Sequence, residues 1–97
     1  MNIWVDAEEF APNGYIRANN VKQAKLLIVA ALLNGDIDEI NINQDLSSYG
    51  HNNENAFDLL EWMIESDMHV NVRFHGKETG RSRDLQKFAF GSCVSLL

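Results

Sequence analysis

The chain has 97 residues, enough for one domain with a single hydrophobic core. Its net charge of −6 excludes duplex nucleic acid as an expected partner, because phosphates require a basic surface. No apolar run approaches the roughly 20 residues that cross a bilayer, so we expect no membrane partner. The single cysteine, Cys93, cannot form an internal disulfide, which indicates a cytoplasmic protein; we expect it to be a small core residue.

The chain opens with a short apolar segment, residues 2–5, that predicts a strand. An acidic cluster of Asp6, Glu8 and Glu9 follows it, and residues 10–14 then turn the chain. Residues 15–17 predict a short extra strand, close enough to the first to pair with it.

The first long helix should begin near Asn20, because Asn20 precedes Gln23 by three residues in the manner of a capping box. Asn34 and Gly35 supply a left-handed stop. The helix has a broad apolar face that we expect to be heavily buried, made of Val21, Ala24, Leu27, Val29, Ala30, Leu32 and Leu33.

The rest of the chain alternates strands and helices. Residues 38–43 predict a strand around Ile40 and Ile42, and the polar residues 44–53 predict a loop. Residues 55–66 predict a second helix, and residues 69–74 a further strand.

A third helix should start within residues 79–82 and bury Leu85, Phe88 and Ala89, and residues 92–96 predict a last edge strand. Strands separated by helices predict a mainly parallel sheet. We therefore expect residues 1–97 to form one small α/β sandwich of two or three layers with about three helices.

Polar side chains follow three of these strands. Asp6, Asp45 and His75 each stand just past a strand, and ligands of open α/β sheets bind at that edge. Two carboxylates could hold Mg²⁺ or Mn²⁺, and the imidazole could act as an acid or base, which makes these three the candidate catalytic residues and the two aspartates the candidate metal ligands. The alternative is that both aspartates only accept backbone N–H bonds in their loops.

The basic side chains are concentrated late in the chain. Residues 1–72 hold three basic and twelve acidic side chains, whereas residues 73–87 hold five basic and two acidic ones. Arg73, Arg81 and Arg83 in this segment are candidate ligands for a phosphate or an acidic partner. The alternative is a solvated helix face.

Four segments resemble the family of cyclic-phosphate-processing receiver-like domains, small proteins of bacteria and phages. Residues 3–15 match its opening strand, acidic cluster, proline and glycine-aromatic turn. Residues 40–46 match its second motif, residues 55–62 the following helix, and residues 72–76 a strand that ends in histidine. The resemblance covers about 85 residues by motif placement, and it implies a reduced flavodoxin-like fold and phosphoester chemistry on cyclic phosphates.

Several positions depart from the family pattern. Ala7 stands where the family has a second aspartate, and Glu9 where it has an arginine. An Asn43–Gln44 pair replaces an Asp–His pair, Gly76 replaces a serine, and Glu78–Thr79 replaces an Asn–Pro pair. Only Asp6, Asp45 and His75 of the polar site are retained, so a carboxylate and an imidazole have been lost, which argues against that chemistry.

Three functions follow from this pattern. The first is a degenerate receiver-like domain that binds a protein partner, as a phage-encoded modulator of a host protein would. The second is a divalent-metal-dependent phosphoesterase that uses Asp6, Asp45 and His75. The third is a non-catalytic binder of a cyclic nucleotide or phosphate that uses the basic segment of residues 73–87.

Overall fold

The structure is a computed structural model that describes residues 1–35, 37–49, 54–90 and 95–96. Its elements, in chain order, are β1 (Asn2–Val5), β2 (Tyr15–Ala18), α1 (Val21–Leu33), β3 (Glu39–Asn43), a short 3-10 helix η1 (Leu46–Tyr49), α2 (Ala56–Glu65), β4 (Asn71–His75), α3 (Gly80–Phe90) and β5 (Ser95–Leu96). Among these residues no helix is long and apolar enough to cross a membrane.

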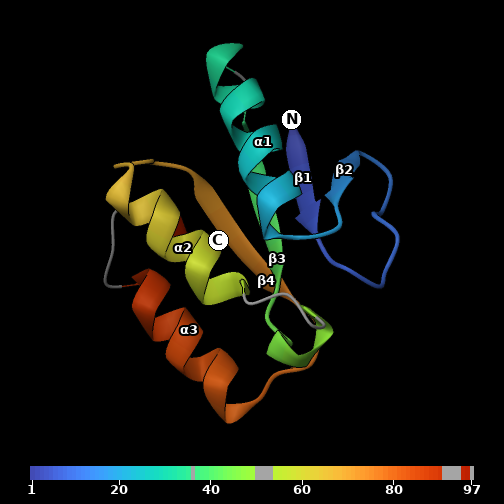
Figure 1. The fold of residues 1–97 in the computed structure, drawn as a ribbon, viewed down its shortest axis with the longest axis vertical. Helices are drawn as coiled ribbons and strands as arrows, with labels where there is room; N and C mark the ends of the chain where they lie inside the picture. The colour runs from blue at the N-terminus through green and yellow to red at the C-terminus, as the bar shows by residue number, and fades with distance from the viewer. Residues whose placement is uncertain (36, 50–53, 91–94, 97) are drawn as a thin grey trace.

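The sheet confirms the predicted fold class. Its strand order is β2-β1-β3-β4-β5, and all four neighbouring pairs are parallel (Figure 1). This is the order of flavodoxin-like domains, in which ligands bind at the carboxyl ends of the strands where the chain changes direction across the sheet, between β1 and β3. The predicted extra strand is β2, which pairs with β1 along its whole length.

The connection between β1 and β2 is unusual, because parallel neighbours are normally joined by a crossover of about a dozen or more residues, commonly a helix. Here residues 6–14 make the connection without a helix. The chain leaves β1 at Asp6, whose backbone N–H donates to Ala18 O at 3.0 Å. The acidic cluster is thereby held at the edge where the strands end.

All three helices cover one face of the sheet (Figure 1). The connections through α1, α2 and α3 all run in the same direction across the sheet, so right-handed crossovers place the three helices on the same side. That face forms the core with the helices through fully buried side chains: Ile3, Val5, Ile40, Ile42 and Val72 from the strands, and Ala24, Ile28, Leu59, Leu60, Met63 and Leu85 from the helices.

The other face of the sheet carries polar and aromatic side chains, because successive residues of a strand point to opposite faces. We call this the open face: Trp4, Tyr15, Arg17, Glu39, Asn41, Arg73 and His75. No helix of the described residues lies over it. Of the two-layer and three-layer sandwiches expected, these residues form the two-layer one.

The helix ends follow the sequence closely. The Asn20 side chain caps α1 by accepting from Gln23 N at 2.8 Å, and Gly35 follows with a φ of 71°. Asn55 caps α2 in a reciprocal capping box with Asp58. These caps satisfy backbone N–H groups that the first turns leave unpaired.

Two burial predictions were wrong. The outer side of α1 is exposed, with Leu33 at 83%, Val29 at 45% and Leu32 at 41%, and Phe88 of α3 is 41% exposed. Helices packed on one face of a sheet bury only the side that meets it, and no second layer lies outside α1. The expected loop over residues 44–53 contains η1, and Cys93 lies outside the described residues.

Candidate functional site

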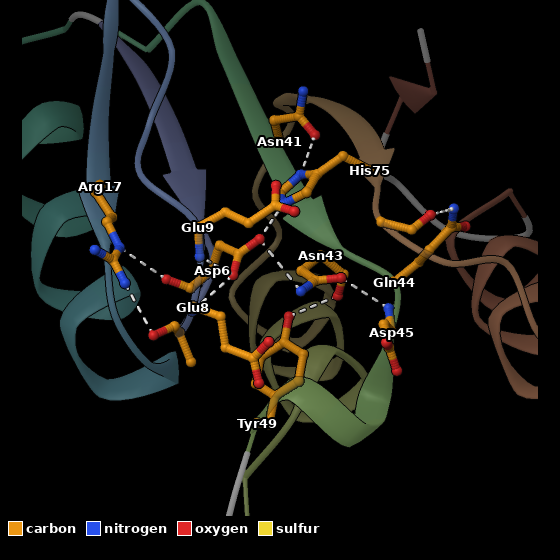
Figure 2. Close-up of polar contacts among 12 residues, drawn as sticks. Asp6, Glu8, Glu9, Arg17, Asn41, Asn43, Gln44, Asp45, Tyr49 and His75 are labelled. Atoms are coloured by element: carbon orange, nitrogen blue, oxygen red, sulfur yellow. Dashed lines mark hydrogen bonds and ion pairs between the residues drawn. The ribbon is translucent and has the colours of Figure 1, made fainter.

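The centre of the site is the carboxylate of Asp6, which is only 1% exposed at the end of β1. Its Oδ1 accepts the backbone N–H groups of Glu8 and Glu9 at 2.8 and 2.9 Å. Its Oδ2 accepts from His75 Nε2 at 2.8 Å and from Asn43 Nδ2 at 3.3 Å (Figure 2). Each carboxylate oxygen has two lone pairs, so the four donors fill the acceptor capacity of this side chain.

His75, at the end of β4, is fixed on three sides. Besides its contact with Asp6, its Nδ1 lies 2.7 Å from Asn41 Oδ1. Its ring stacks on Trp4 with centroids 3.6 Å apart and planes 10° apart. Both ring nitrogens therefore have a polar partner, and one face of the ring is covered by Trp4.

Asn43 connects the ends of β1, β3 and β4. It donates to Asp6, its Oδ1 accepts the backbone N–H of Asp45 at 2.9 Å, and its carbonyl accepts the hydroxyl of buried Tyr49 at 2.8 Å. Gly76 follows β4 with a φ of 89°, and a Cβ there would overlap Asn43 Oδ1. In this arrangement position 76 therefore has no room for a side chain.

The electrostatics favour a charged Asp6. Burial raises the pKa of this carboxyl, but hydrogen bonds from the backbones of Glu9 and Glu8 and from His75 together lower its pKa below the ordinary value. Burial, together with the charge of Asp6, raises the pKa of Tyr49, which remains a phenol donor. The result is a buried carboxylate that is hydrogen-bonded to His75 and Asn43 and to two backbone N–H groups.

Several of these residues were not predicted from the sequence. Asn41 and Asn43 alternate with isoleucines along β3, and that alternation is a signal for two amides on the same face of the sheet. Arg17 of β2 also contributes, since its Nε donates to Asp6 O at 3.0 Å and its guanidinium also reaches Ala7 O. Neither Arg17 nor Trp4 carries a sequence signal for this role, because each depends on which strands become neighbours.

Comparison with known proteins assigns the chain to a family. The family model described as "Cyclic-phosphate processing Receiver domain" matches residues 1–88. The chain belongs to this family. No curated protein and no solved structure matches the chain. As expected for a receiver domain of this family, the polar residues gather at the carboxyl ends of parallel strands.

The predicted catalytic trio of this receiver domain is brought to one edge, but its members have different surroundings. Asp6 and His75 are bonded to each other, whereas Asp45 lies beyond β3. Asp45 and Asp6 both line a cavity of about 190 Å³ whose other walls are Glu8, Glu9, Asn43, Gly76 and Lys77.

In this arrangement Asp6 has no free acceptor oxygen for a divalent cation. The Asp6 oxygens are filled by protein donors, and the described residues contain no cluster of three or more His, Cys, Asp or Glu side chains that could hold a metal ion. The role of Asp6 and Asp45 as metal ligands remains a prediction.

A larger groove of about 590 Å³ adjoins the cavity, because Asp45 and Lys77 line both. Its remaining walls come from the starts of α2 and α3 and from η1: Leu46, Asn55, Thr79, Gly80 and Arg81. Of the three predicted ligand arginines, only Arg81 lines this groove. Arg73 Nε lies 3.8 Å from Glu39 on the open face, and Arg83 Nε lies 3.6 Å from Glu78.

Proposed function

We propose that this receiver domain acts by binding a protein partner rather than by turning over a cyclic phosphate. The observation that carries the proposal is the filled acceptor set of Asp6, which offers no lone pair to a metal ion or a reacting group. His75, the remaining candidate acid or base, is held by Asn41, Asp6 and Trp4. A scaffold whose polar site is satisfied by its own side chains suits recognition.

The open face supplies a surface for that partner. It carries Trp4, Tyr15, Arg17 and Arg73, and tryptophan, tyrosine and arginine are the residue types that dominate protein interfaces energetically. Beside it Phe10 is 87% exposed, with the Arg17 guanidinium carbon 5.4 Å from its ring centroid. An exposed phenylalanine next to an arginine suits a partner with an apolar pocket and a nearby acidic group.

We propose the cytoplasm as the setting, because a chain with one cysteine requires no oxidising compartment. The partner we propose is a host protein, with the chain as its phage-encoded modulator, in keeping with the occurrence of the family in bacteria and phages.

Two experiments test this function. Capture of proteins from cell extract should be lost with Phe10→Asp and retained with Asp45→Ala. In parallel, Mn²⁺ and a panel of cyclic phosphates are added while bound ligand and released product are both followed. We expect no product. Turnover that disappears in Asp45→Ala would overturn the proposal in favour of the phosphoesterase.

A second candidate function is non-catalytic binding of a cyclic nucleotide or phosphate in the larger groove. Lys77 and Arg81 both line it where α2 and α3 begin, and helix N-termini attract anions. If this function holds, Arg81→Glu abolishes binding of the cyclic phosphate. Arg83→Glu is the matched control, because Arg83 belongs to the same helix but does not line the groove.

A further inference from the structure

The outer side of α1 carries an apolar stripe opposite its buried side. Leu26, Val29 and Leu33 are 65%, 45% and 83% exposed, and the fully buried Ile28 faces the sheet. Their spacing of three and then four residues is that of the seam of a coiled coil. A single helix layer over a sheet has no internal partner for such a seam.

The charged side chains of α1 are placed unfavourably with respect to its helix dipole. The helix has no acidic residue in its first turn and no basic residue in its last turn, whereas Lys22 stands near its start. Lys22 precedes Leu26 by four residues, so it continues the seam, and its side chain is exposed. A solitary helix is stabilised by the opposite arrangement, with acids first and bases last.

We propose that this seam pairs with the same seam of a second copy of the chain, with the two α1 helices antiparallel. In antiparallel pairing, Leu26 of each copy packs against Val29 of the other, and Lys22 of each lies beside Leu33 of the other. Each lysine then meets the negative C-terminal end of the facing helix, where α1 has no cation of its own. Ala30, next to the seam, lets the two helices approach closely.

The charge distribution favours this occupant. The chain carries a net charge of −6, but α1 contains no acidic residue and one of its two lysines, Lys25, is paired with Glu54, so two copies of α1 bring no carboxylates of their own together across the seam. The seam has three apolar side chains, and a stable interface buries about 800 Å² per partner. We therefore expect a reversible dimer that dissociates in the micromolar range.

Sedimentation equilibrium of the purified full chain over a range of concentrations tests this pairing. Leu26→Asp should raise the dissociation constant of the dimer by about a hundredfold or more, because it places a charge in each half of the seam. Lys22→Glu should raise it by about tenfold, because it sets an anion beside each helix C-terminus. Phe10→Asp is the matched control: it also removes an exposed apolar side chain, and it should leave the dimer unchanged.

Each outcome decides the proposal. Loss of the dimer in Leu26→Asp, weakening in Lys22→Glu and no change in Phe10→Asp support it. A chain that is monomeric at all concentrations overturns it, as does a dimer that Leu26→Asp leaves intact or that Lys22→Glu leaves unchanged or strengthens. Circular dichroism of each variant confirms folding, which we expect because all three side chains are exposed.

Discussion

Gly76 combines two demands that other residues cannot meet together. Its φ of 89° lies in the region that favours glycine, and a Cβ added to it would overlap the side-chain oxygen of Asn43. The resemblance to the family puts an aspartate at position 43 and a serine at position 76. A side chain at position 76 would displace Asn43 from Asp6.

We expect Gly76→Ala to destabilise the fold by about 2–4 kcal/mol, because it adds an overlap with Asn43 to the backbone strain. Gly14→Ala is the control: Gly14 has nearly the same φ, 90°, with no atom within 4 Å of an added Cβ, and should cost only about 1 kcal/mol. Urea denaturation measures both. An equal loss of stability in Gly76→Ala and Gly14→Ala would mean that Asn43 moves aside without an energetic cost.

Asp6 makes the stability of the fold depend on pH in acid. Its pKa in the folded chain lies below the ordinary value of 3.8, so the ionised form favours folding. This contribution is complete above that value and is lost as the pH falls through the folded-state pKa. We expect Asp6→Asn to cost about 3 kcal/mol near neutral pH and less at low pH, as measured by urea denaturation across pH 2–7. Glu61→Gln, which removes an exposed carboxylate, should show no comparable cost.

At the scale of elements, the strands and caps could be predicted because their signals are local. The alternation of residues 40–43 and the Asn20 and Asn55 caps depend only on neighbours within a few positions. The exposure of Leu33 and Phe88 could not be predicted in the same way. An apolar helix side indicates that burial is favourable, but which side is buried depends on how many layers the sheet receives.

The cap of α1 offers a test at this scale. Asn20→Ala should destabilise the fold by about 1 kcal/mol, because it removes the acceptor for the Gln23 N–H. Asn19→Ala should have almost no effect, since the α1 cap uses the backbone N–H of Asn19 and not its side chain. Thermal unfolding of the two variants makes the comparison, and a similar loss in both would show that the cap at Asn20 contributes nothing.

For the molecule as a whole, the mainly parallel sheet and the edge that bears the site were predictable, because alternating strands and helices leave few topologies. It was not predictable from the sequence whether Asp6, Asp45 and His75 form a working site. That property depends on side chains from β1, β3 and β4, and on Asn41 and Trp4, whose effect on His75 exists only after the sheet is assembled.

Because protein donors occupy the acceptor oxygens of Asp6, we also make a prediction for the thermal stability of the whole domain in the presence of a metal ion. A ligand that binds the folded state raises its melting temperature, so about 1 mM Mn²⁺ or Mg²⁺ should leave the melting temperature unchanged. Differential scanning fluorimetry with and without the metal provides the measurement. A rise that Asp6→Asn abolishes would show that a cation displaces the protein donors.

The bond between Asp6 and His75 spans 69 positions of the chain, from the end of the first strand to the end of the fourth. Contacts between residues this distant in sequence form late in folding, because the conformational entropy of the intervening chain must be lost before they form. The local units through α2 can assemble without them. Asp6→Asn should consequently accelerate unfolding and leave the refolding rate nearly unchanged in stopped-flow measurements. The contact between Asp6 and His75 then governs how long the folded state lasts rather than how quickly it is reached.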